Sequence, residues 1–299
     1  MTLAQIGRLT EEEARQHIEN LYWPDGPVCP HCGNKDKIYT LTGKAHREGL
    51  YKCAACRKQF TVTVGTVMHR SHLTCKEWLI VFHLMTSSKK GMSALQIKRE
   101  LGKTSYQSAW FLCHRIRAAM ELMGVLQGTV EVDETYVGGK KTGRWSQGRS
   151  EKKTPVLAMI ERDGRAYSRK IPDATKDTLH RAIKETVLPD SRIMTDEWKS
   201  YGGIGKHFEG GHQTVCHSRG EYARGDVNTN SAEAYFALLK RGVHGTFHHV
   251  SKKHLGRYCH EFSFRWSFRK VTDAERCDSV IANMGGKRLT YSKLTEEVL

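Results

Sequence analysis

Two closely spaced pairs of cysteines constrain the fold of this chain more than any other feature of its sequence. Cys29 and Cys32 form the first C-x-x-C pair, and Cys53 and Cys56 form the second after a gap of twenty residues. Four thiolates in two tight pairs supply the tetrahedral, soft-ligand set that Zn²⁺ prefers. Disulfides and a redox C-x-x-C are the alternatives, but the spacing favours one structural Zn²⁺ per chain.

The residues around the cysteines read as a small domain, predicted over residues 1–64. A helix is expected at 10–22, where Thr10 is a plausible cap and the acidic residues after it suit a helix N-terminus. Short alternating stretches at 37–42, 49–52 and 60–64 read as strands. The sequence therefore predicts a zinc ribbon. Because so small a sheet has little core, the metal should supply most of its stability.

Residues 65–127 are predicted to be helical. Helices are expected at 74–88, at 94–101 and from 104 to 123, with glycines in the intervening turns. Short helix, turn and longer helix form a helix-turn-helix pattern, in which Arg115 and Arg117 of the third helix would contact DNA. The alternative is a plain three-helix packing module with Trp110 and Phe111 in its core.

Charge narrows the class of partner. The chain has 299 residues, a formal net charge of +16 and a pI near 9.5, and such an excess favours polyanions, of which nucleic acid is the first candidate. No run approaches the ~18 apolar residues of a membrane helix, and the N-terminal stretch lacks the features of a secretory signal. We therefore expect no membrane partner and a cytoplasmic, nucleoid-associated protein.

From residue 128 the pattern changes to strands. A strand at 129–137 is followed by a hairpin, 155–161 and 166–171, whose Asp-Gly turn is a strong signal. A helix at 175–187, a strand at 192–195, a weaker strand at 213–216 and a helix from 230 follow. Three antiparallel strands and then α/β alternation predict a ribonuclease-H-like α/β domain over residues 128–272, a fold whose site is built on strand ends. Residues 273–299 read as a polar, loosely held tail.

Three acidic positions in this domain are candidate metal ligands. Asp133 and Asp196 each follow an apolar, β-prone run, and a carboxylate at a strand end is a well-held ligand. The helix from 230 carries Glu233, with Lys240 two turns later on the same face. Asn230 reads as the N-cap of this helix and Glu233 as its capping-box partner. Together these residues could hold two divalent ions for phosphodiester chemistry; singly, each aspartate could be only a turn former.

Two further segments carry positive charge. The loop 140–153 contains Lys140, Lys141, Arg144 and Arg149, which could follow a DNA backbone or form a solvated surface. A basic amphipathic helix is predicted at 251–270, and its Lys252 and Lys253 are candidate DNA contacts. The stretch 205–229, which contains His217, is interpreted as a surface loop.

Five long strings resemble one family. The chain is similar to bacterial insertion-sequence transposases of the Asp-Asp-Glu/Asn type, in the group with an N-terminal zinc ribbon. The strings that carry this resemblance are WPDGPVCPHCG at 23–33, VDETYVGGK at 132–140, TDEWKSYGG at 195–203, NSAEAYFALLKRG at 230–242 and HHVSKKHLGRY at 248–258.

The resemblance implies a function. The ribbon and the helical module would bind the terminal inverted repeats of double-stranded DNA. Asp133, Asp196 and a third residue would hold two Mg²⁺ or Mn²⁺ ions, and Lys240 would contact phosphate near the scissile bond. The site would cleave the element ends and join them to target DNA, and the chain would act as a homo-oligomer on paired ends.

The third ligand and two rival functions stay open. Members of the group use Asn or Glu as the third residue, and this chain has both Asn230 and Glu233. Charge favours Glu233, because a hard divalent cation prefers a carboxylate. The rivals are a catalytically inactive zinc-ribbon DNA-binding regulator derived from a transposase, and a ribonuclease-H-like nuclease.

Overall fold

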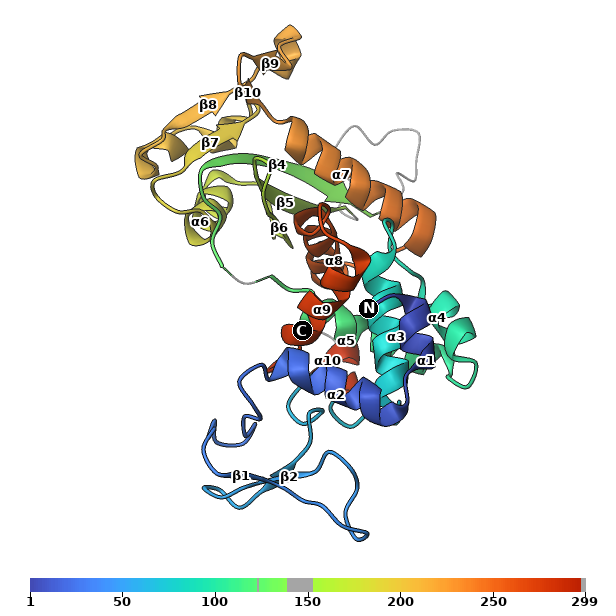
Figure 1. The fold of residues 1–299 in the computed structure, drawn as a ribbon. Coiled ribbons are helices and arrows are strands. Elements are labelled where there is room, and N and C mark those ends of the chain that lie inside the picture. Colours follow the sequence, from blue (N-terminus) through green and yellow to red (C-terminus); the bar gives the residue numbers. More distant parts are fainter. Residues whose placement is uncertain (123, 139–152, 297–299) are drawn as a thin grey trace. The chain divides into compact units, whose positions relative to one another are not determined.

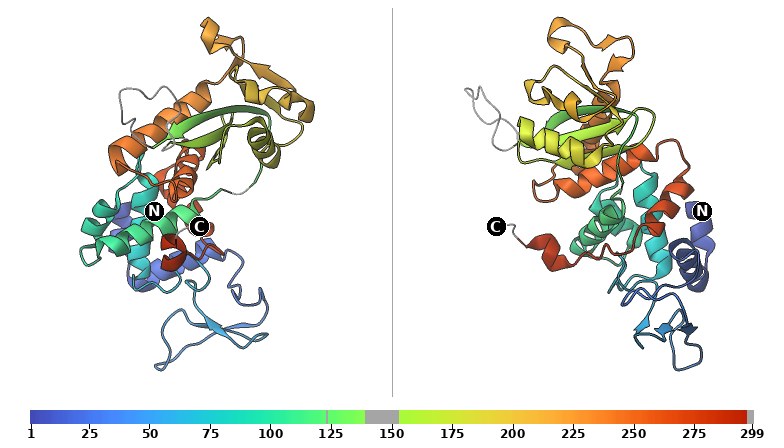
Figure 2. Two further views of the ribbon diagram at one scale, coloured as in Figure 1. Left: turned by 180° about the vertical axis from the view of Figure 1, so that it is seen from behind. Right: turned by 90° about the vertical axis from the view of Figure 1, so that its left-hand side faces the viewer.

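The computed structural model describes residues 1–122, 124–138 and 153–296 (Figures 1 and 2). It contains two compact units. One consists of Met1–Met120 with Val271–Leu299, and the other of Glu121–Lys270. Among the described residues no helix is long and apolar enough to cross a membrane. Lys140, Lys141, Arg144 and Arg149 lie outside the described residues.

The first unit begins with two short helices and the predicted ribbon. The helices are α1 (Leu3–Arg8) and α2 (Glu11–Tyr22), and capping boxes start both. An antiparallel sheet follows, made of β1 (Ile38–Thr40), β2 (Tyr51–Cys53) and β3 (Gln59–Phe60). Aromatic rings join ribbon and helix: Trp23, directly after α2, lies 5.6 Å from the ring of Tyr51 and 5.9 Å from that of Phe60. These contacts give the small sheet an apolar neighbour.

Three helices then form the predicted helical module. They are α3 (Cys75–Ser87), α4 (Ala94–Leu101) and α5 (Tyr106–Ala119). Thr74, Ser93 and Ser105 cap them with side-chain oxygens, as such residues do at helix N-termini. The third helix ends four residues before the predicted position 123, ahead of Gly124 with its φ of +108°.

The C-terminal segment belongs to this same unit. α9 (Asp273–Ala282) packs against α3, buries Cys277, Val280 and Ile281, and is followed by α10 (Tyr291–Thr295). The Asn283 side chain donates a hydrogen bond to the carbonyl of Ala119 at 2.8 Å. The prediction of a loosely held tail is therefore wrong up to residue 296, because the apolar side chains of α9 complete a core that the N-terminal helices begin.

The second unit is a five-stranded mixed sheet in the order β6-β5-β4-β7-β8. β4 (Thr129–Val137), β5 (Thr154–Glu161) and β6 (Ala166–Lys170) are antiparallel neighbours. β7 (Arg192–Thr195) and β8 (His212–Thr214) run parallel to β4. This is the arrangement expected of a ribonuclease-H-like domain, and it confirms the predicted fold class.

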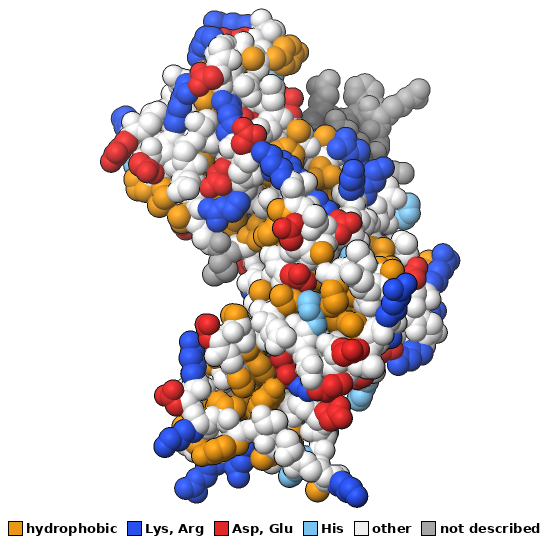
Figure 3. All heavy atoms as spheres, viewed as in Figure 1, with side chains coloured by type: hydrophobic (Ala, Val, Ile, Leu, Met, Phe, Trp, Pro, Cys, Tyr) orange, Lys and Arg blue, Asp and Glu red, His pale blue; other side chains and the backbone are white. Residues whose placement is uncertain are grey.

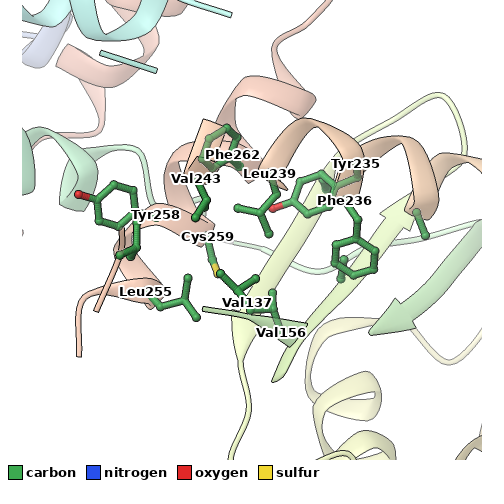
Figure 4. Close-up of a cluster of buried hydrophobic side chains, with 14 of the residues drawn as sticks. Val137, Val156, Tyr235, Phe236, Leu239, Val243, Leu255, Tyr258, Cys259 and Phe262 are labelled. Atoms are coloured by element: carbon green, nitrogen blue, oxygen red, sulfur yellow. The ribbon is translucent and has the colours of Figure 1, made fainter. Parts of the chain in front are cut away.

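Helices cover both faces of this sheet. α6 (Lys176–Thr186) lies on one face, and α7 (Asn230–Gly242) and α8 (Leu255–Ser267) lie on the other (Figure 1). β5 serves both cores, because successive side chains of a strand point to opposite faces: Leu157 and Met159 pack in the α6 core, and Val156 and Ala158 in the other. Figure 4 shows the second core, with α7 and α8 side chains gathered against Val137 and Val156.

Short elements connect these layers. They are the 3₁₀ helices η1 (Lys199–Tyr201), η2 (Ile204–His207) and η3 (His217–Arg219), the strands β9 (Ala223–Arg224) and β10 (Val227–Asn228), and the π-helical turn η4 (Val243–Phe247). β9 and β10 form an antiparallel hairpin just before α7.

Candidate active site and zinc site

The register of the sheet aligns the two candidate aspartates. The last parallel pair between β4 and β7 is Glu131 with Met194. Asp133 and Asp196 each follow that pair by two residues, so both lie on the same face and at the same level of the two strands. That face is the one that α7 covers, because Val137 of β4, four residues after Asp133, packs in the core beneath α7.

One detail of the prediction needs correction. Asp196 directly follows the end of β7, but Asp133 lies in the middle of β4. β4 continues to Val137 because its other edge stays paired with β5 after β7 has ended. Asp133 is therefore held within a strand that is paired on both sides of it, rather than at a strand end.

The two aspartates share one electrostatic site. Burial raises the pKa of Asp133 to about 7, and the negative charges of Glu134 and Asp196 act in the same direction. A hydrogen bond of 2.7 Å from the Glu134 N–H opposes the shift only in part. Burial also raises the pKa of Asp196, against the Trp198 N–H that donates to its Oδ1 at 3.0 Å. Crowded, desolvated carboxylates of this kind are stabilised by a bound cation.

α7 brings Asn230 and Glu233 to this region. Both are exposed, and the charge of Glu233 is among the causes that raise the pKa of Asp133. Thr229 rather than Asn230 occupies the N-cap position, and neither side chain makes a capping hydrogen bond. The predicted N-cap and capping box are therefore wrong. The side chains of Asn230 and Glu233 do not have the helix-capping role that the sequence predicted for them.

A buried carboxylate from the sheet performs that capping instead. Glu131 of β4 is fully buried, and its Oε2 accepts hydrogen bonds from the N–H groups of Ser231 at 2.7 Å and Ala232 at 3.3 Å. Its Oε1 accepts from Arg162, at 3.1 Å from Nε and 2.9 Å from Nη2. The N-terminus of α7 is thus fixed to the strand position two residues before Asp133.

Sequence reasoning missed Glu131. In the string V-E-V-D it alternates with valines, which is the pattern of a solvent-facing strand residue. The only local signal that could have identified it is its place on the same strand face as Asp133, two residues away. Its partners on α7 lie 100 residues further along the chain.

His217 also belongs to this region and was interpreted as part of a surface loop. The Glu197 carboxylate accepts hydrogen bonds from the N–H groups of Ser218 and His217, each at 2.9 Å, and these bonds lower the pKa of Glu197 to about 2. The ring Nε2 of His217 lies 3.4 Å from the Thr229 hydroxyl and 3.9 Å from a Glu233 carboxylate oxygen. His217 therefore lies between the end of β7 and the start of α7.

Lys240 is exposed near the end of α7. In Figure 3 basic side chains lie over this helix. Within the described part of the chain, only the four ribbon cysteines form a group of three or more candidate ligands with atoms all within 4.8 Å of one another. Asp133, Asp196 and Glu233 are therefore spaced more widely than a closed site for one small ion.

The four cysteines converge at one end of the ribbon. The sulfurs of Cys29 and Cys56 are 3.6 Å apart, and those of Cys32 and Cys53 are 3.8 Å apart. Tetrahedral zinc with bonds of about 2.3 Å separates its sulfur ligands by roughly 3.8 Å. Backbone N–H groups of Cys56 and Ala55 lower the pKa of Cys53 to about 6, which favours the thiolate that zinc requires. These residues fit one Zn²⁺.

The predicted DNA contacts differ in how exposed they are. Arg115 and Arg117 are only 5% and 1% exposed, so neither lies on an exposed face of α5 as predicted, and their contact with DNA stays a prediction. The helix turns them inward, where the Arg115 guanidinium stacks 5.0 Å from the Trp78 ring. Lys252 is exposed and Lys253 half-buried, in the turn before α8, which starts at Leu255 rather than at 251.

Comparisons with known proteins agree with this architecture. Residues 9–59 match the family model of the transposase zinc-ribbon domain, and residues 125–267 match that of the ISXO2-like transposase domain. The chain is 26% identical over 280 residues to an uncharacterized protein in transposable element ISH50 of Halobacterium salinarum, which covers 88% of this chain and 93% of that protein. The chain therefore combines a transposase zinc-ribbon domain with an ISXO2-like transposase domain.

Proposed function

We propose that the chain is a DNA transposase that binds the terminal inverted repeats of an insertion sequence and catalyses metal-dependent strand cleavage and strand transfer. The observation that carries this proposal is the proximity of Asp133 and Asp196, which each follow the last parallel pair of β4 and β7 by two residues and interact electrostatically. Two half-buried carboxylates with raised pKa values favour a bound divalent cation. Because its substrate is DNA, the protein would act in the cytoplasm, at the nucleoid.

The catalytic ions would be two Mg²⁺ or Mn²⁺. Asp133 and Asp196 would each supply oxygens, and the ions would assist an in-line displacement at phosphorus. The nucleophile is water in cleavage and a DNA 3′-hydroxyl in strand transfer, and the leaving group is a 3′-oxygen in each case. The carboxylate oxygens of Asp133, Asp196 and Glu233 do not all lie within 4.8 Å of one another, and this wider spacing is compatible with two ions rather than one.

Glu233 is our preferred third ligand. Its charge acts on Asp133, and His217 lies 3.9 Å away and can orient its carboxylate. Asn230 remains the alternative, and it sits at the first position of α7 without a capping role. Lys240 would contact phosphate near the scissile bond. Sequence-independent affinity would come from Lys140, Lys141, Arg144, Arg149, Lys252 and Lys253.

The experiment is a cleavage assay with the zinc-loaded chain, Mg²⁺ and labelled duplex from the ends of its own element. Wild-type protein should nick at the repeats and join the ends to a target duplex. Asp133→Ala and Asp196→Ala should each abolish cleavage and leave duplex affinity within about twofold, since basic residues supply affinity. Asp190→Ala, which removes an exposed aspartate elsewhere on the unit, is the matched control.

The same assay identifies the third ligand. Glu233→Gln should be inactive if Glu233 binds metal, whereas Asn230→Ala should then keep most of its activity. The reverse pattern assigns the role to Asn230. Wild-type cleavage by both aspartate variants would contradict the proposed mechanism, and cutting of RNA–DNA hybrids alone would favour the nuclease alternative.

A further inference from the structure

A buried guanidinium without an acidic partner lies in the first unit. Arg115 is 5% exposed, and within the described residues no carboxylate lies at salt-bridge distance from it. Its Nη2 donates to the His69 carbonyl at 2.6 Å, and its plane stacks near Trp78 and Phe111, but its Nε has no acceptor. A buried cation that lacks a negatively charged partner is stabilised when an anion binds next to it.

Two cavities border this guanidinium. The larger, of about 450 Å³, lies between the segment 70–73 and the turn before α5, and the smaller, of about 230 Å³, is closed by residues 288–291. They share Arg70, Phe111 and Arg115 in their walls. Among the described residues that line them there is no aspartate or glutamate.

The surroundings of both cavities are positive. Arg70 and Arg288 are exposed at their rims, and in the described structure neither forms an ion pair. His69, Arg70, Arg115 and Arg288 all line the smaller cavity, and the charges of these three arginines add to burial in lowering the pKa of His69. Burial and Arg288 also lower the pKa of Arg115, to about 10.

Neutral donors complete the walls of the larger cavity. They include the hydroxyl groups of Ser71, Thr104, Ser105 and Ser108. Ser105 caps α5, a helix of 14 residues, so the positive end of that helix faces this region. Guanidinium groups, hydroxyl groups and a helix N-terminus are the donors that phosphate oxygens accept from.

We propose that the two cavities form one phosphate-binding site, with Arg115 at its floor and Arg70 and Arg288 at its rim, and that its ligand is the backbone phosphate of DNA. The choice of ligand rests on the proposed function. The exposed rim suits a phosphodiester that arrives as part of a longer chain, because that chain can continue past Arg70 and Arg288. The guanidinium fork binds phosphate in a bidentate manner.

The test compares two double variants of the full, zinc-loaded chain. Arg70→Gln/Arg288→Gln removes the two rim charges, and Lys89→Gln/Lys90→Gln removes two exposed charges of the same unit that line neither cavity. Affinity for a duplex of arbitrary sequence is measured without Mg²⁺ over a range of salt. The rim variant should bind about tenfold more weakly and lose roughly one to two from its log–log salt slope, and the control should change much less.

Inorganic phosphate provides the second arm. It should raise the Tm of wild-type protein and of the lysine control above the value in sodium chloride of equal ionic strength, and should leave the rim variant unchanged. Equal loss of duplex affinity in both double variants would overturn the proposal, because it would reduce the effect to net charge. A phosphate effect on Tm without any selective loss of duplex affinity would identify a free-phosphate site and overturn the assignment to DNA.

These measurements separate this proposal from the proposed function. They record affinity and stability rather than cleavage, so the phosphate-binding site can be confirmed even if the chain cuts no DNA. If wild-type protein binds no duplex at all, the proposed function fails and the assignment of these cavities to DNA fails with it.

Discussion

Asp133 is held in a state that opposes its own ionisation. Its pKa is raised to about 7 by burial and by neighbouring carboxylates, against an ordinary value of 3.8. Between these two values the folded chain retains a proton that the unfolded chain has released. The free energy of unfolding of the metal-free protein should therefore fall as pH rises from about 4 to 7, and this contribution should stay constant above that window.

Asp133→Asn tests this effect. The variant carries no titrating group at this position, so at pH 8 it should be more stable than wild type by on the order of 1–3 kcal/mol, and at pH 4 the difference should be small. Urea unfolding without Mg²⁺ or Mn²⁺, and with the ribbon zinc retained, measures both values. Asp190→Asn should show no such pH-dependent gain. A variant that is less stable than wild type at pH 8 would contradict the raised pKa.

The candidate site was partly predictable at the residue scale. Asp196 and Glu233 follow from local patterns, because strand ends and helix starts leave signals in neighbouring residues, and Asp133 follows from the apolar run before it although it lies within β4. His217 leaves none, and Glu131 leaves only its place two residues before Asp133 on the same strand face. Glu131 bonds the N–H of Ser231 in α7, 100 residues later, and His217 is held by Glu197, 20 residues earlier in the chain. Such roles depend on tertiary contacts, which hydrophobic periodicity does not encode.

At the scale of elements, the position of α7 depends on one partly buried ion pair, between Arg162 and Glu131. Arg162 bonds Glu131 and also donates to the carbonyl of Asp226 at 2.7 Å, so it joins β4 to the hairpin that precedes α7. Glu131 in turn accepts from the first N–H groups of the helix. Candidate ligands on β4 and α7 therefore share one anchor, and the spacing between them should depend on it.

Glu131→Gln should weaken this anchor without a large change in volume. The amide lacks the charge that pairs with Arg162, so we expect a loss of stability of about 2–4 kcal/mol and faster amide hydrogen exchange at 230–233. Cleavage should fall while duplex affinity is retained. Arg169→Gln, which breaks an exposed ion pair with Glu185, should cost less than about 1 kcal/mol. Unchanged exchange at the start of α7 would disprove the anchor.

Strong local patterns predicted most elements of the fold. The bounds predicted for β4, β7 and α4 agree with those of the structure, because each is a clear alternating or helical run ended by polar residues or glycine. At the scale of the whole molecule the sequence was less informative. The return of residues 271–299 to the N-terminal unit could not be read from it, because α9 is short and its partners on α3 are distant in sequence.

The division into two units separates what zinc stabilises from what it does not. The ribbon buries few side chains. Its aromatic contacts with Trp23 come from Tyr51 and Phe60 on β2 and β3, the strands next to the four-cysteine group. The second unit has two core clusters of its own, on opposite faces of its sheet. Loss of zinc should therefore unfold the ribbon and leave the sheet of the second unit intact.

Cys29→Ser/Cys53→Ser provides the test of this division. Zinc content should fall from about one ion per chain to none, because two serines cannot replace two thiolates. Hydrogen exchange should become fast across the ribbon strands, and β4 and β5 should remain protected. Cys216→Ser, outside the ribbon, should keep its zinc. Retention of zinc by the double variant would disprove the four-cysteine site, and unfolding of β4 and β5 would show that the two units do not fold independently.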